Sequence, residues 1–158
     1  MLRNNKAQEE IVGFAMIVII VSIILVFFLI FSLSDKSQAE SYEASSWLQA
    51  SLQYTSDCMA GYENLPVQKL IAACYNQEKC ESEEEACEVL NDTLIGMLEE
   101  SWQVGDEFPI RGYKLEITSG EENILSIEKG NVTSNYRGTQ QVLPERGISI
   151  QVLFRTYY

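Results

Sequence analysis

The longest apolar run in the chain lies close to its beginning, between Ile11 and Leu33. These 23 residues include no charged side chain, and only Gly13, Ser22 and Ser32 interrupt the apolar character. As an α-helix that rises about 1.5 Å per residue, the run would measure roughly 35 Å, which is enough to cross the hydrocarbon core of a bilayer. The pattern therefore predicts a transmembrane helix.

The residues that flank this run indicate that it is retained and how it is oriented. A secretory signal peptide has a shorter apolar stretch, of about 7–15 residues, followed by a small-residue cleavage site. The sequence SLSDKSQAES, at the end of the run, is a poor cleavage site. Arg3 and Lys6 precede the run, whereas only Lys36, next to Asp35, follows it closely. Because positive charge is enriched on the cytoplasmic side, we expect a cytoplasmic N-terminus and residues 34–158 outside.

Beyond the apolar run the chain keeps a helical pattern. Residues 34–60 contain neither Gly nor Pro. One side of the expected helix carries residues at intervals of three and four, namely Ala44, Trp47, Leu48, Leu52 and Thr55. We therefore predict one helix from about Glu9 to about Asp57, ended by Gly61 and Pro66. Its second half, residues 34–60, would be a helical stalk that packs on an external domain.

The external domain, residues 61–158, is predicted to begin with a largely helical part that reaches residue 103. Its first helix is expected in LPVQKLIAACYN, with the apolar positions Leu65, Leu70, Ile71 and Cys74. In the next helix, Ser82 and Glu85 have the spacing of a capping box. An apolar stripe follows them and consists of Ala86, Val89, Leu90, Thr93, Met97 and Leu98.

From Gly105 onward the apolar positions alternate, which is the period of a β-strand. Tyr113, Leu115 and Ile117 share one face of YKLEIT, and the turn signal SGEEN separates this strand from a weaker one in ILSIEKGN. A short strand is expected in TQQVLPERG. The clearest strand is ISIQVLFRTYY, with one face made of Ile148, Ile150, Val152, Phe154, Thr156 and Tyr158. The order predicts an α+β fold of three or four antiparallel strands with helices packed on one face.

Composition narrows the classes of function. The formal net charge is −12, and the 158 residues include no His. Nucleic-acid binding needs clustered Lys and Arg, so this charge argues against a nucleic-acid partner. Without His the chain lacks the commonest general base and metal ligand, and its sequence holds no catalytic constellation. We therefore predict no catalytic residue, cofactor or metal; a deep pocket with several acids would favour the alternative of an extracytoplasmic enzyme.

The four cysteines are Cys58, Cys74, Cys80 and Cys87. In an external domain they favour two disulfides. A zinc site is disfavoured, because the gaps of fifteen, five and six residues contain no closely spaced pair. Three connectivities are possible, and we favour Cys58–Cys87 with Cys74–Cys80. The first bond would tie the end of the stalk to the second helix, and the second would close a short turn.

Two segments match the acceptor motif for N-glycosylation. They are Asn91-Asp92-Thr93, within a predicted helix, and Asn131-Val132-Thr133, in a predicted turn. Asn131, in the predicted turn, is the better candidate of the two, whereas Asn91 is better explained as an ordinary solvated helix residue.

The start of the chain resembles a known signal. The sequence KAQEEIVGFAMIVIIV, from Lys6 to Val21, is similar to the class III signal of archaeal type IV pilin-like proteins. In that family a short basic leader ends in Lys or Arg, then Gly or Ala, often followed by Gln, and a prepilin peptidase cuts before the apolar run. The resemblance, which covers roughly residues 3–33, implies a leader at residues 1–7 and a cut between Ala7 and Gln8. Residues 8–33 would then form a transmembrane or filament-core helix.

Two acids follow the expected cut. If Gln8 becomes the mature N-terminus, its amine is costly in an apolar filament core unless a carboxylate pairs with it. Glu9 or Glu10 of a neighbouring subunit would supply that carboxylate. Bacterial type IV pilins have a glutamate at the fifth mature position, which is Val12 here. The alternative is that both acids complement the dipole at the start of the helix and stay among lipid headgroups.

The sequence as a whole predicts a structural protein: a pilin-like subunit of an archaeal surface filament, used for adhesion or a related surface task. Its expected partners are the prepilin peptidase, the pilus assembly machinery and copies of itself. It would lie in the cell membrane before assembly and in a cell-surface filament afterwards. The alternative is a single-pass membrane-anchored external binding domain that never polymerises.

Overall fold

The computed structural model describes the backbone of residues 5–145 and 147–158, and the side chains of residues 13–30, 42–145 and 147–158. The chain forms two compact units, Met1–Ala39 and Glu40–Tyr158. We call Glu40–Tyr158 the head. Helix α1 (Asn5–Gln53) contributes residues to both units.

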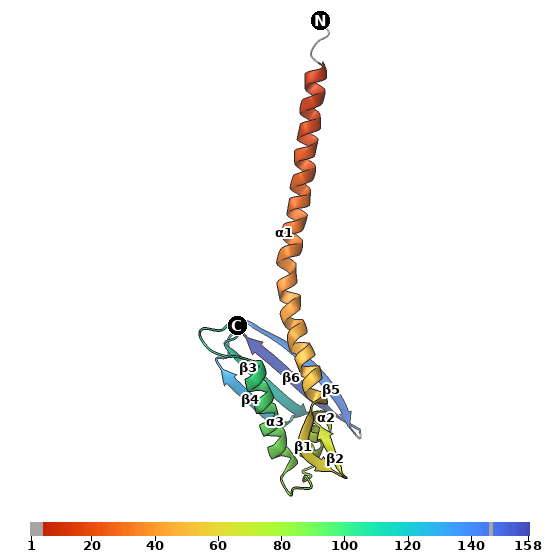
Figure 1. The fold of residues 1–158 in the computed structure, drawn as a ribbon, viewed down its shortest axis with the longest axis vertical. Coiled ribbons are helices and arrows are strands. Elements are labelled where there is room, and N and C mark those ends of the chain that lie inside the picture. Colours follow the sequence, from red (N-terminus) through yellow and green to blue (C-terminus); the bar gives the residue numbers. More distant parts are fainter. Residues whose placement is uncertain (1–4, 146) are drawn as a thin grey trace. The chain divides into compact units, whose positions relative to one another are not determined.

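The head contains two helices and two antiparallel sheets besides the end of α1 (Figure 1). One sheet is a two-stranded hairpin of β1 and β2, and the other has the strand order β4-β3-β6-β5. In chain order the elements after α1 are β1 (Thr55–Ala60), β2 (Glu63–Pro66), α2 (Val67–Tyr75), α3 (Ala86–Ser101), β3 (Gly112–Ser119), β4 (Glu122–Gly130), β5 (Tyr136–Glu145) and β6 (Ile148–Tyr157). The predicted α+β class is confirmed.

The alternating pattern places one face of the four-stranded sheet in the core. Tyr113, Leu115 and Ile117 of β3 are all buried, as the sequence predicts. Their partners on β6 alternate in the same way, with Ile150, Val152, Phe154 and Thr156 buried. The turn between β3 and β4 lies at Gly120, which has a φ of 60°, a value that glycine adopts at little energetic cost.

Phe154 is the centre of an aromatic cluster that joins the sheet to the helices. Its ring centroid lies 4.7 Å from that of Trp47 on α1, 5.4 Å from that of Trp102 and 6.5 Å from that of Tyr113. Trp47 also donates a hydrogen bond from Nε1 to Ser101 Oγ at the end of α3 (2.9 Å). The cluster therefore holds α1, α3 and the sheet together, as such ring contacts add to simple burial.

The opposite face of the sheet carries ion pairs. Glu116 lies between Lys114 (3.1 Å) and Arg155 (3.0 Å), and Lys114 also approaches Glu128 (3.7 Å). The hydrogen bond to Glu116 raises the pKa of Lys114 above its ordinary value. The inner face meets Trp47 and Leu48 of α1 and Leu94 of α3 within one apolar cluster. Helices thus cover one face, as the strand and helix order predicts.

Helix α1 ends earlier than the sequence pattern predicts. It stops at Gln53, not near Asp57, and residues 55–60 form β1 instead of the end of a stalk. The alternating burial of Ser56 and Cys58 explains the change, because both side chains point into the head from an extended strand. The hydroxyl of Ser56 donates to the carbonyl oxygen of Leu65 (2.7 Å), which fixes β1 against β2.

The helical part of the external domain also differs from the prediction in detail. Helix α3 begins at Ala86, and its N-cap residue, Glu85, makes no capping hydrogen bond through its side chain. The predicted capping box is therefore wrong: the hydroxyl of Ser82 donates to Glu84 (2.8 Å) instead. The buried stripe of α3 is Ala86, Leu90, Leu94 and Leu98. The predicted members Thr93 and Met97 are only half-buried.

We expect Phe154→Ala to lower the free energy of unfolding of the full chain by about 3–5 kcal/mol, because it removes a fully buried ring and leaves a cavity among three other rings. Chemical denaturation followed by Trp fluorescence and by circular dichroism measures the change. Val142→Ala on exposed β5 is the control and should change it by less than about 0.5 kcal/mol. Equal effects of the two substitutions would contradict the central place of Phe154.

Candidate functional site

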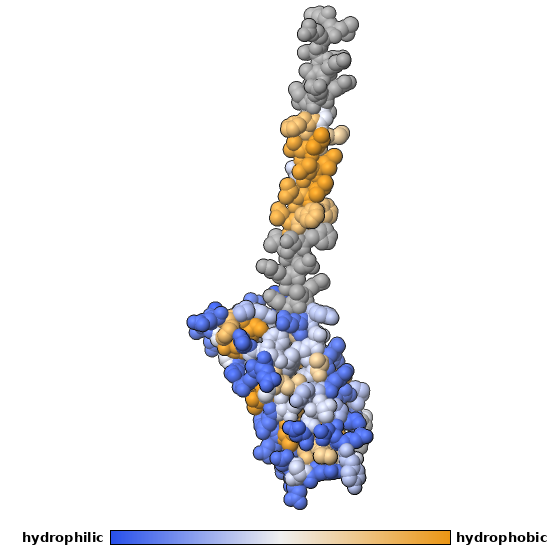
Figure 2. Space-filling model, viewed as in Figure 1, coloured by the Kyte–Doolittle hydropathy of each residue, from blue (hydrophilic) through white to orange (hydrophobic). Residues whose placement is uncertain are grey.

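Among the residues whose side chains the structure describes, the most extensive exposed apolar surface is the stretch of α1 from Gly13 to Ile30. These 18 residues have a mean hydropathy of 3.2, and none of them is buried. Fifteen large apolar side chains are exposed here, from Phe14 (71%) to Ile30 (61%). Figure 2 shows them as a continuous apolar band. By length and composition, this stretch is able to cross a membrane.

The polar group within this band is satisfied by the helix itself. Ser22 donates from Oγ to the carbonyl oxygen of Val18 (2.7 Å). A serine that bonds back to the preceding turn has no unpaired donor in an apolar medium. The band between Gly13 and Ile30 is therefore compatible with lipid, or with other apolar helices, all the way round.

Several sequence-predicted residues lie where only the backbone is described. Lys6, Ala7 and Gln8 at the expected cut, and the acids Glu9 and Glu10, belong to α1, which begins at Asn5. Their side chains lie outside the described residues. Both the cleavage site and the pairing of acids with a neighbour's amine therefore stay predictions.

All four cysteines form disulfides, but with a different connectivity from the one we favour on sequence grounds. The bonds are Cys58–Cys80 and Cys74–Cys87, with Cα–Cα distances of 5.1 and 4.5 Å. Our expected pairing, Cys58–Cys87 with Cys74–Cys80, is wrong. The reason is geometric: Cys74 near the end of α2 faces Cys87 in the first turn of α3, and Cys58 lies on a strand rather than at a helix end.

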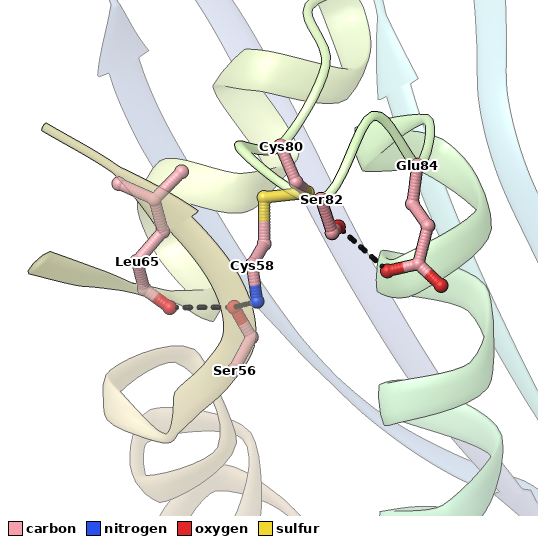
Figure 3. Close-up of a disulfide and its surroundings, with 6 residues drawn as sticks. All are labelled: Ser56, Cys58, Leu65, Cys80, Ser82 and Glu84. Atoms are coloured by element: carbon pink, nitrogen blue, oxygen red, sulfur yellow. Dashed lines mark hydrogen bonds between the residues drawn. A yellow bond between two sulfur atoms is a disulfide. The ribbon is translucent and has the colours of Figure 1, made fainter. Parts of the chain in front are cut away.

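The Cys58–Cys80 bond fastens the β1–β2 hairpin to the loop before α3 (Figure 3). The backbone N–H of Cys58 donates to Ser56 Oγ (3.3 Å), and the hydroxyl of Ser56 donates onward to Leu65. On the loop side, the backbone N–H of Glu81 donates to the carbonyl oxygen of Met59 (3.0 Å). Covalent and hydrogen bonds together hold this end of the head.

An open depression of about 430 Å³, which we call the hollow, lies between β1 and α3. It is lined by Tyr54, Ser56, Asp57, Glu84, Val89, Asp92, Thr93, Gly96, Met97 and Glu100. Four of these residues are acids, and none is Lys or Arg. Val89, Gly96 and Met97 give it an apolar strip along α3.

The hollow combines four acidic side chains with apolar surface. No group of three or more acids or cysteines among the described residues is placed to hold a metal ion. The hydroxyl of Ser56 donates to a backbone carbonyl, so it is not oriented by a basic partner as a nucleophile would be. What the hollow offers is several carboxylate acceptors beside apolar surface, which suits a hydrogen-bond donor that has an apolar body.

Sequence reasoning did not find the hollow, because its lining comes from Tyr54 just after α1, from β1, from the loop before α3 and from α3 itself. Only the early end of α1 and the turn into β1 bring these segments together. The signal that was available is Gly96, an isolated glycine in an otherwise helical pattern.

The two sequons occupy different environments. Asn131 follows the end of β4 and is exposed, and the hydroxyl of Thr133 lies 3.0 Å from the carbonyl oxygen of Tyr158. Asn91 is half-buried on α3, with its amide nitrogen 3.4 Å from Asp92 Oδ1. The location of Asn131 beyond a strand end agrees with the preference for it, and glycosylation at either position stays a prediction.

In comparisons with known proteins, the chain matches no protein-family model, no curated protein and no solved structure.

We expect removal of either disulfide by paired Cys→Ser substitutions to lower the free energy of unfolding by about 2–4 kcal/mol. Peptide mapping without reduction should yield linked peptides containing Cys58 with Cys80 and Cys74 with Cys87. Any other connectivity in correctly folded protein would contradict the geometry of β1 and α2.

Proposed function

We propose that the chain is a structural subunit of an archaeal type IV pilus-like surface filament, with an adhesive or related surface role, assembled through its N-terminal apolar helix. The observation that supports this most is that all the large apolar side chains between Gly13 and Ile30 are exposed. Helices that are apolar all round need either lipid or other apolar helices as surroundings. A filament subunit would have lipid around this helix before assembly and other apolar helices around it afterwards.

The apolar band gains a large free energy whenever it leaves water, either in lipid or in a filament core. Burial of a Val, Leu, Ile, Phe or Met side chain is worth roughly 1.5–3 kcal/mol. Fifteen such side chains therefore represent tens of kcal/mol gross whenever the band leaves water. In lipid most of this gain is already realised, so assembly from the membrane depends on close helix packing and on polar pairing within the filament.

Processing would increase the acidity of the chain. Loss of residues 1–7 removes Arg3 and Lys6, which changes the formal net charge from −12 to −14. It also creates an amine at Gln8. The prepilin peptidase would make this cut, and Glu9 or Glu10 of a neighbouring copy would pair with the new amine. The pilus assembly machinery would then move the helix from the membrane, with its N-terminus cytoplasmic, into the filament.

A second function has one observation in its favour. The hollow in the head has the chemistry of a binding site, and it needs no polymer. On this alternative the chain is a single-pass, membrane-anchored external binding domain, and Gly13–Ile30 serves as its anchor only.

The two functions differ in the expected mature protein. For a filament subunit, mass spectrometry of protein purified from cells should find Gln8 as the first residue, and electron microscopy of sheared cell-surface material should show filaments that contain this chain. A persistent leader and an absence of filaments would contradict the proposal and favour the plain anchor.

A charge placed within the apolar band should prevent assembly. We expect Ile20→Lys to abolish filaments, because a lysine at the middle of an apolar helix costs about 2.5–3.5 kcal/mol per copy in a bilayer. Filament yield and membrane retention of the head are the measurements. Val142→Lys on β5 is the matched control, since Ile20 and Val142 are similarly exposed, at 53% and 49%. Normal filaments from Ile20→Lys would contradict a packed apolar core.

A further inference from the structure

Tyr62 is the most exposed large apolar residue of the head. Its side chain is 92% exposed at the turn between β1 and β2. Its backbone has φ of 70°, in the left-handed region that glycine and asparagine tolerate better than a bulky residue. A tyrosine here costs conformational energy and buries almost nothing within the head. Folding of the head therefore gives no reason for the ring.

The turn that presents Tyr62 is firmly held. The backbone N–H of Tyr62 donates to Glu81 Oε1 (3.3 Å), and Glu81 donates from its own N–H to Met59 (3.0 Å). The Cys58–Cys80 disulfide links the same two segments. The backbone that carries the exposed ring is thus already ordered, so binding would cost only the rotamer freedom of the side chain, which favours an interface anchor.

Gly96 is the second residue that folding does not explain. It lies in the middle of α3, where glycine is less stable than alanine by about 1 kcal/mol. A Cβ atom at this position would meet nothing within 4 Å. No packing within the head thus requires glycine here. Its effect is to leave the helix backbone open along the apolar strip of the hollow, as close approach by another group requires.

The chemistry of the two features is complementary. A tyrosine combines an apolar ring with one hydrogen-bond donor. The hollow combines Val89 and Met97 with the carboxylates of Asp92 and Glu100. The ring would lie over Gly96 against the Met97 thioether, a favourable sulfur–aromatic contact, while the hydroxyl donates to a carboxylate.

We propose that Tyr62 of one head inserts into the hollow of a second copy of the chain and packs over Gly96. Tyr62 does not occupy the hollow of its own head, since its side chain is almost wholly exposed. The contact joins two different surfaces, so it is heterologous, which is the kind of contact that builds an open helical array when its rotation does not close a ring. This inference rests on the proposed function, because the filament is what would bring the heads of neighbouring copies together.

The test uses the full chain in cells that make it. Two variants with different affinity tags, Tyr62→Cys and Gly96→Cys, are co-expressed and treated with a short bifunctional maleimide, because the missing ring leaves a gap between the backbones. The four native cysteines are all paired, so the introduced thiols are the reactive ones. Val132→Cys, on a residue that is 58% exposed, replaces Tyr62→Cys in the control.

We expect a cross-linked product between position 62 of one copy and position 96 of another in clear excess over the Val132 control, because the filament core keeps the two positions adjacent although the substituted copy lacks the ring. A second pair of variants keeps the fold: Tyr62→Asn suits the left-handed backbone, and Gly96→Leu suits a helix. The copy that carries Tyr62→Cys contributes its turn to the cross-linked product, and its own hollow takes no part. We therefore expect Gly96→Leu, added to that same copy, to leave the product intact. Tyr62→Asn in native-cysteine chains should weaken the association of heads about tenfold without lowering the melting temperature.

The outcomes separate this contact from the filament. Filaments without the 62–96 product would overturn the contact and leave the proposed function standing. The product in membranes of cells without filaments would support the contact and count against the filament. Products that link two copies at position 62, or position 62 to a thiol of another protein, in place of the 62–96 product would overturn the contact.

Discussion

Fifteen large apolar side chains on one stretch of α1 have to leave water, and none of the described residues of the chain covers them. This constraint governs how the rest of the sequence is used. Between Gly13 and Ile30 the helix is apolar all round, so no single side of it is marked as a packing face. Farther along, Ala44, Leu48 and Leu52 are buried on one side only. The first part of α1 therefore needs apolar surroundings on all sides, whereas the last part packs on the head through one side only.

The head uses two kinds of cross-connection. Where the four-stranded sheet supplies a broad apolar face, the rings around Phe154 hold the layers, and an exposed ion pair between Lys129 and Glu99 (2.8 Å) links β4 to α3. Around the two-stranded hairpin and α2 there is much less sheet to pack against. Both disulfides lie in this region. Covalent links are thus concentrated around the smaller of the two sheets, and disulfides of this kind are common in small secreted domains.

The parts of the fold that depend on local periodicity follow from the sequence. Alternation in YKLEIT and ISIQVLFRTYY predicts β3 and β6 correctly, because burying one face of a strand requires that period. The end of α1 does not follow, since Thr55 continues the helical pattern, whereas residues 55–60 form a strand that pairs with β2 and alternates in burial. The disulfide connectivity is predicted wrongly as a result, because Cys58 is expected at a helix end and lies on a strand. The hollow is missed for the same reason.

The acidity of the chain limits the ways in which heads can meet. Charged heads repel one another over roughly the Debye length, about 8 Å at physiological ionic strength, so a useful contact must be short-ranged. A lysine entering the hollow would gain from its carboxylates but would first lose the hydration of its ammonium group. A phenol donates one hydrogen bond to the same carboxylates and carries no charge to desolvate. Tyr62 and Gly96 each break a local rule of stability, and residues that do so without a benefit to the fold mark surfaces where function takes precedence over stability.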